Sequence, residues 1–134
     1  MAVTANQVTP RRDGCRASGK LAASTRLYGG SLSFVNSGGY LVDGIAAGAN
    51  KFAGVMVAEA DNSDGANGDV DGEFYSEGDF VLTGSGFTQA NVGALAYASD
   101  NYTVTATATS MVEIGVFREF ISATQMLVSL RRKT

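Results

Sequence analysis

The 134-residue sequence contains no histidine and no tryptophan, and it has only one cysteine and one proline. Without histidine it lacks the commonest general base, the usual zinc ligand and every catalytic triad that depends on an imidazole. Cys15 has no cysteine partner for an internal disulfide. It is followed by Arg16, so it is either a thiol of lowered pKa or a small residue in an extended segment. We therefore expect no enzyme, no cofactor and no resident metal.

Long apolar runs are also missing. No stretch of about 18 apolar residues exists in the sequence, so we expect no membrane span. The opening residues MAVTANQVTPRRDGC place their charges after a short apolar stretch, which is the reverse of a secretory signal. The sequence predicts a protein that is made and kept in a reducing compartment.

Glycine and strand-forming residues are plentiful instead. Seventeen glycines and a composition that is 45% hydrophobic and 17% charged indicate one globular domain with many tight turns. The segment TVTATATS at 103–110 places threonines at every second position and Val104, Ala106 and Ala108 between them. A period of two over this length predicts a half-buried strand, packed either in the core or at a subunit interface.

Similar patterns predict further strands, and none of the windows has a helical period over ten residues. The other expected strands lie at 31–36, 40–42, 54–60, 79–84, 93–99, 112–117 and 126–130. The turn residues at 37–39 predict a hairpin between the first two, and Gly115 indicates a bulge or a close approach. Single helical turns are expected at 86–91 and 122–125. Short strands cut by glycine turns are typical of an all-β fold, here a small sandwich or barrel-like domain of about seven or eight strands.

Charge is unevenly distributed along the chain. Residues 43–100 carry ten acids against the single Lys51, whereas the first 26 residues are basic. The basic residues of this first segment are Arg11, Arg12, Arg16, Lys20 and Arg26. We interpret residues 1–26 as an extended basic arm and residues 27–134 as the β-rich domain. Such an arm is either a solvated tail or a contact to an acidic partner; nucleic acid is disfavoured, because the arm has no aromatic residue for base stacking.

The stretch DNSDGANGDVDGE at 61–73 is the most chemically suggestive part of the sequence. Oxygen ligands suit hard cations, so a loose calcium or magnesium site is one reading. Its ligands would be Asp61, Asp64, Asp69 and Asp71. The alternative is a long, charged hairpin loop, because Asp, Asn and Gly all favour turns. Mobile, solvated carboxylates do not suit paired-carboxylate catalysis, which needs one raised pKa.

Several short patterns occur in the order found in a known family. They are GVMV at 54–57, GEF at 72–74, FTQANVGALAYASDNYTVT at 87–105, EIGV at 113–116 and MLVSL at 126–130. In these patterns the chain from 27 to 130 resembles the head decoration, or cement, proteins of tailed bacteriophages. Residues 1–26 and 61–71 lie outside the resemblance.

The resemblance implies a β-rich virion protein, often a homotrimer, that is made in the host cytoplasm and binds the outer surface of the head. There it would hold neighbouring subunits of the major capsid protein together, with the basic arm lying on an acidic shell surface. It implies no direct contact with nucleic acid or membrane. Another virion β-domain, associated with a tail or fibre, and a small metal-dependent enzyme are the alternatives.

Overall fold

The computed structural model describes residues 16–130, and this part of the chain is almost entirely β-structure. The strands of its first half are β1 (Arg16–Lys20), β2 (Thr25–Leu27), β3 (Leu32–Val35), β4 (Leu41–Val42), β5 (Lys51–Met56), β6 (Ala60–Asn62) and β7 (Asp71–Tyr75). Those of its second half are β8 (Gly78–Thr83), β9 (Leu95–Ala98), β10 (Val104–Thr105), β11 (Val112–Ser122) and β12 (Gln125–Leu130). Two short 3-10 helices, η1 (Ala46–Gly48) and η2 (Gln89–Asn91), complete the elements of the described residues.

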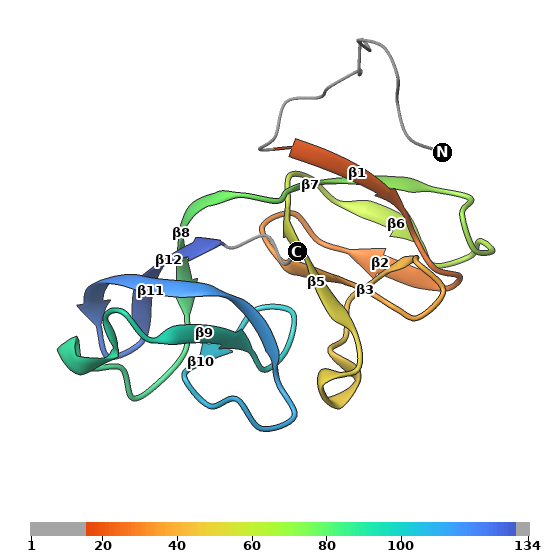
Figure 1. The fold of residues 1–134 in the computed structure, drawn as a ribbon. Coiled ribbons are helices and arrows are strands. Elements are labelled where there is room, and N and C mark those ends of the chain that lie inside the picture. Colours follow the sequence, from red (N-terminus) through yellow and green to blue (C-terminus); the bar gives the residue numbers. More distant parts are fainter. Residues whose placement is uncertain (1–15, 131–134) are drawn as a thin grey trace, which may run out of the picture.

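These strands form three antiparallel sheets. The first has the order β1-β7-β5-β3-β4, the second has the order β10-β9-β11-β12-β8, and β2 pairs with β6 in a third. A parallel bridge between Leu21 and Leu41 joins the two edges of the first sheet, and one between Thr83 and Thr103 does the same in the second. Figure 1 shows β8–β12 grouped on one side of the molecule and β1–β7 on the other. We call these two groups the C-terminal and N-terminal units.

The alternation of side chains along the strands allows the first sheet to contribute to two buried clusters, one on each face. In β5, Val55 belongs to a buried cluster shared with the C-terminal unit, whereas the next residue, Met56, belongs to a cluster shared with β2 and β6. Successive side chains of a strand point to opposite faces, so the first sheet lies between two cores. Phe117 from β11 and Phe34 from β3 are fully buried in the larger cluster, and each contributes about 1.5–3 kcal/mol by leaving water.

Two glycines allow strands to approach closely. A Cβ atom on Gly54 in β5 would collide with the carbonyl oxygen of Tyr75, and one on Gly115 in β11 would collide with that of Ser129. Gly115 also lies at a register shift between β11 and β9. The sequence interpretation of this glycine as a bulge or close approach is therefore confirmed.

The structure confirms the all-β fold and most of the expected strands. The hairpin of β3 and β4 turns at 37–39 as expected, with Asn36 Oδ1 accepting hydrogen bonds from the backbone of Gly38 and Tyr40. The helical turn expected at 86–91 is η2, but 122–125 is the tight turn between β11 and β12. Strands β1, β2, β6 and β7 were not expected, and the strand expected at 54–60 is β5, which runs from Lys51 to Met56.

The predicted strand at 103–110 is largely wrong. Only Val104 and Thr105 pair with β9, and residues 106–110 are exposed. Thr105 Oγ1 accepts a hydrogen bond from the Thr107 backbone, and Ser110 has φ of 59°, a left-handed conformation that ends an extended run. Alanine buries too little apolar area to anchor such a segment against the core, so the local threonine turn prevails.

The assignment of 16–26 to an extended arm is also corrected. Residues 16–20 form β1 at the edge of the first sheet, and Thr25 and Arg26 belong to β2. Gly19 allows β1 to pack closely against Leu41, and Leu21 and Leu27 are fully buried. The part of the proposed arm before residue 16 lies outside the described residues.

Candidate functional site

The outward face of β1 and β7 carries a row of opposite charges. Arg16 pairs with Glu73, and Lys20 Nζ lies 3.2 Å from Asp71 Oδ1. These side chains alternate with inward-facing residues, so strand geometry places them on one face. All four are about half exposed or more, and such pairs contribute about 0–1 kcal/mol each.

A second charged group lies across β2 and β6. Arg26 Nε donates a hydrogen bond to Glu59 Oε2 at 2.7 Å, and its Nε lies 3.9 Å from Asp61 Oδ2. The guanidinium also stands 5.0 Å from the ring centroid of Tyr28, within cation–π range. The hydrogen bond and charge of Glu59 raise the pKa of Arg26 further, so the group stays cationic. The Arg26 side chain is therefore held by acidic and aromatic neighbours of its own chain.

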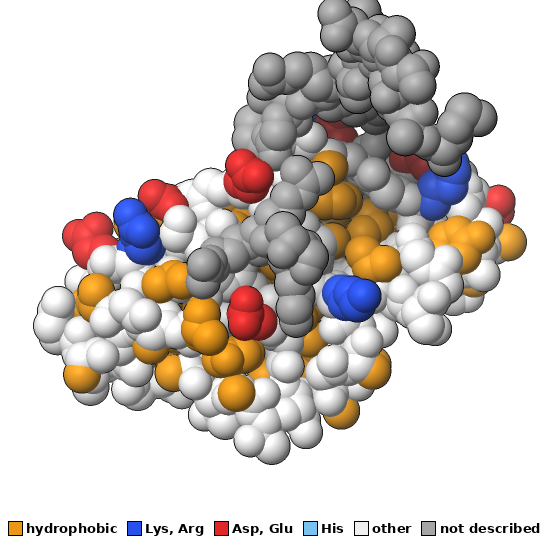
Figure 2. Space-filling view, viewed as in Figure 1, with side chains coloured by type: hydrophobic (Ala, Val, Ile, Leu, Met, Phe, Trp, Pro, Cys, Tyr) orange, Lys and Arg blue, Asp and Glu red, His pale blue; other side chains and the backbone are white. Residues whose placement is uncertain are grey.

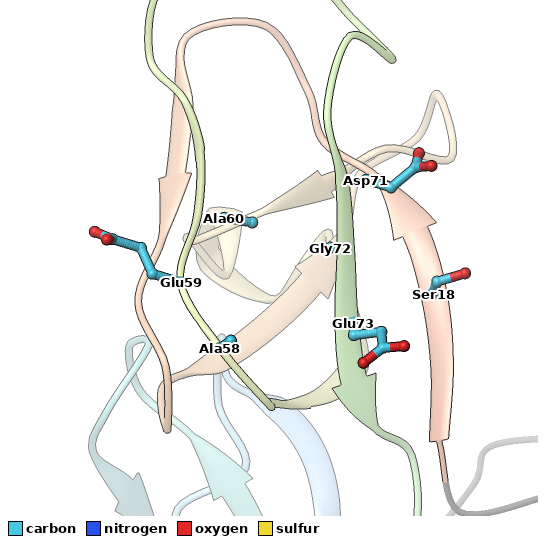
Figure 3. Close-up of a pocket in the computed structure, with 7 residues that line it drawn as sticks. All are labelled: Ser18, Ala58, Glu59, Ala60, Asp71, Gly72 and Glu73. Atoms are coloured by element: carbon cyan, nitrogen blue, oxygen red, sulfur yellow. The ribbon is translucent and has the colours of Figure 1, made fainter.

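A hollow of about 410 Å³ separates these two charged groups. Its floor consists of small residues such as Ala58, Ala60 and Gly72, and its rim carries carboxylates from both sides. Figure 3 shows Glu59 on one side and Asp71 and Glu73 on the other, with their carboxylates pointing away from one another. The rim carboxylates each have a cation of the same chain nearby. The hollow therefore lacks converging ligands for a cation or for general acid–base chemistry.

The aspartates suggested as a calcium or magnesium site are not brought together. Within residues 16–130, no group of three or more His, Cys, Asp or Glu residues could hold a metal ion. Asp61 accepts hydrogen bonds from the backbone and hydroxyl of Ser63, and these bonds hold its pKa below the ordinary value. Asp69 accepts from the Ala66 backbone at 2.9 Å, and Asp64 is exposed. These carboxylates shape the turn or stand in solvent.

The acidic loop is not a hairpin, because β6 and β7 belong to different sheets. Residues 63–70 instead pack against the connection between β1 and β2. Gly68 N donates to Leu21 O at 2.9 Å, and Asn67 Oδ1 accepts from Ala23 N at 2.7 Å. The loop closes one end of the N-terminal unit and has a structural role.

The five basic residues proposed as partner contacts therefore fall into two groups. Arg11 and Arg12 lie outside the described residues, and Arg16, Lys20 and Arg26 are on β1 and β2. The last three are exposed enough to reach a partner, yet each already has an acidic neighbour in its own chain. Binding an acidic surface through them would require an exchange of ion-pair partners.

Sequence reasoning missed an apolar surface on the C-terminal unit. Leu95 in β9 is 38% exposed and lies opposite Val116 in β11, while Val81 in β8 is 52% exposed and lies opposite Leu127 in β12. Val116 and Leu127 are half-buried, and in the β11–β12 pair they face Ser129 and Glu119, so the two apolar pairs are offset from each other. We call these four residues the outer apolar row. Hydrophobic side chains are also visible on this unit in Figure 2. The bulge between Glu113 and Gly115 changes the face on which Val116 lies, so simple alternation along β11 could not separate this outer side chain from the core.

Comparison with known proteins adds no relative to this picture. No protein-family model, no curated protein and no solved structure matches the chain. In the described part of the chain, no helix has the length and apolar character needed to cross a membrane.

Proposed function

We propose that this protein is a capsid decoration protein that binds the outside of a tailed-bacteriophage head and stabilises the lattice of the major capsid protein. The outer apolar row, Val81, Leu95, Val116 and Leu127, is the observation that carries the proposal. It lies on a bulged sheet backed by a large buried cluster, so its side chains are held outward on a packed support and are available for adhesion.

The resemblance of residues 27–130 to cement proteins supports the same function. A small all-β molecule present in many copies on a shell needs only modest contacts, because avidity multiplies them. On this proposal the protein acts by adhesion, with no enzymatic step, and it assembles on the virion surface as a homotrimer. Around the hollow of the N-terminal unit, the carboxylates are solvated and ion-paired, a state that suits solubility better than acid–base chemistry.

Cosedimentation with purified empty heads tests the proposal directly. We expect saturable binding to assembled shells, with a fixed ratio of this protein to the major capsid protein. Shells coated with the protein should also break at a higher temperature than bare shells. No binding to shells from the cognate phage would contradict the proposed function.

Variants of the outer apolar row test the surface itself. Val81→Lys and Leu95→Lys place a charge on exposed strand positions, so we expect at least tenfold weaker shell binding with little change in thermal stability. Val92→Lys is the matched control, because Val92 is also 38% exposed but lies in the turn after η2. Equal binding by all three variants would exclude this face as the contact.

The role of the basic arm is tested by deleting residues 1–15 and not the whole segment 1–26. Removing residues 1–26 would delete β1 and part of β2, so loss of binding would only report unfolding. Removing residues 1–15 leaves every described strand in place. If Arg11 and Arg12 contact an acidic shell surface, this shorter deletion weakens binding most at low salt. Unchanged occupancy at all salt concentrations would refute the role of the arm.

A further inference from the structure

The segment 103–110 has the residue pattern of a strand, but only a short part of it forms one. Its threonines alternate with small apolar residues, and β-branched residues favour extended backbone. In the structure only Val104 and Thr105 pair with β9, and the chain then leaves the edge of the second sheet. Sequence preference and conformation therefore disagree over residues 106–110.

The backbone of this segment is available for pairing. Among the described residues, two hydrogen bonds involve residues 106–110, from Thr107 N to Thr105 Oγ1 and from Met111 N to Ala108 O. No hydrogen bond among the described residues uses the backbone N–H groups of Ala108, Thr109 and Ser110, and these residues are exposed. β10 is the last strand of its sheet, and the end of β8 touches it at Thr103 and Val104. An extended 106–110 would prolong the sheet edge beyond this contact.

A small hollow lies at the base of the segment. It has a volume of about 190 Å³, and its lining includes Gly48, Lys51, Phe52, Met111 and Glu113. This volume is below the range of small-molecule sites, about 300–1,000 Å³, but suits one protein side chain. Strand addition typically combines backbone pairing along an edge with pockets for side chains.

The chemistry of the segment identifies the kind of partner. Residues 101–112 carry no charged side chain, and Tyr102 is their only aromatic residue. Such a surface has nothing to attract phosphate and little for a base or sugar to stack on. Its recognition elements are peptide N–H and C=O groups at strand spacing, and these match the exposed edge of another protein strand.

We infer that residues 106–110 become an extended edge strand on binding and pair with a strand edge of the major capsid protein. This inference rests on the proposed function and adds the element that makes the contact. The segment continues directly from the strand that borders β9, the strand of the outer apolar row that carries Leu95. Backbone pairing and apolar contact would then act on one continuous surface.

Proline substitutions test this pairing. Successive N–H groups of a strand point to opposite sides, so at least one of Ala108→Pro and Thr109→Pro removes a donor that faces the partner. Neither N–H donates to another described residue, so both variants should fold. We expect at least one of them to bind shells at least tenfold more weakly than the wild type. The controls Ala108→Thr and Thr109→Val keep the N–H and should bind normally.

Hydrogen exchange provides a second readout. We expect the amides of 106–110 to exchange at least tenfold more slowly on shells than in the free protein. Normal shell binding by both proline variants, or unchanged exchange in the bound protein, would overturn the inference and leave the proposed function standing. Protection that appears in concentrated protein without shells would assign the edge to a second copy and contradict the capsid partner. Failure of the wild type to bind would remove both proposals.

Discussion

Asn62 Nδ2 donates a hydrogen bond of 2.9 Å to the carbonyl oxygen of Ala22, which lies 40 residues earlier in the chain. The same amide group donates to Ala66 O at 2.9 Å, and Asn62 is only 3% exposed. This side chain therefore fastens the acidic loop to the connection between β1 and β2. Gly65 is needed beside it, because a Cβ atom there would collide with Asn62 Oδ1.

Replacing Asn62 with alanine should destabilise the fold strongly. Two hydrogen bonds are lost, and the carbonyl group of the buried Ala22 is left without its side-chain donor, whereas Ala66 O still accepts from Asp69 N at 3.2 Å. We expect the free energy of unfolding to fall by about 2–4 kcal/mol in urea denaturation. The control is Asp64→Ala in the same loop, where the exposed side chain should change this energy by about 0.5 kcal/mol or less. Similar losses in both variants would show that Asn62 has no special role.

Glycine-to-alanine substitutions should distinguish glycines that are required by a close backbone approach from glycines that only add freedom to the unfolded chain. Gly54→Ala pushes a methyl group against the carbonyl of Tyr75, so we expect a loss of about 1–3 kcal/mol in the free energy of unfolding. Gly44→Ala meets no atom within 4 Å, and we expect a gain of about 0.4–1 kcal/mol through reduced freedom of the unfolded chain. Calorimetric melting of both variants checks the pair. A stabilising effect of Gly54→Ala would contradict the close approach of Gly54 to the Tyr75 carbonyl.

The stability of the acidic loop should depend on pH through Asp61. Its hydrogen bonds with Ser63 lower its pKa in the folded protein, so it binds a proton less readily than in the unfolded chain. The stabilisation is therefore present above the ordinary aspartate pKa of about 3.9, and it is lost as pH falls through the lower folded value. We expect Ser63→Ala to raise the pKa of Asp61 in an NMR titration. An unchanged value would assign the shift to another cause.

The ion pair between Lys20 and Asp71 should be weak and sensitive to salt. Both side chains are about two-thirds exposed, at 64% and 67%. A double-mutant cycle of Lys20→Ala and Asp71→Ala should give a coupling energy below about 1 kcal/mol. The coupling should shrink at 1 M salt, where the screening length is about 3 Å. As a control, a double-mutant cycle of Lys51 and Asp71 should give no coupling energy. A coupling energy above about 2 kcal/mol between Lys20 and Asp71 would contradict their exposed geometry.

The local signals in the sequence predicted much of the fold correctly. The turn at Gly38 and Gly39 and the close approach at Gly115 follow from glycine positions, and the structure has both. The strand β1 was missed because RASGK carries charges and a glycine, and only its pairing with β7 makes it a strand. Residues 106–110 were assigned to a strand because of their period, but no strand among residues 16–130 pairs with them.

The candidate surfaces could be predicted from the sequence even less than the strands, because they form only in the tertiary structure. The basic residues and the acidic stretch appeared as separate features, and the structure places several of them side by side on β1, β7, β2 and β6. The outer apolar row joins residues from four strands, so no single segment reveals it.

The sequence by itself determined the all-β class, the turn-rich architecture and the absence of imidazole chemistry, because composition and residue period act locally. Tertiary structure alone decided which charges neutralise one another and which apolar side chains face outward. Lys20 and Asp71 are separated by 51 residues, and they meet only because β1 and β7 become neighbours. Strand neighbours are chosen by the burial of the whole core, which no local pattern encodes.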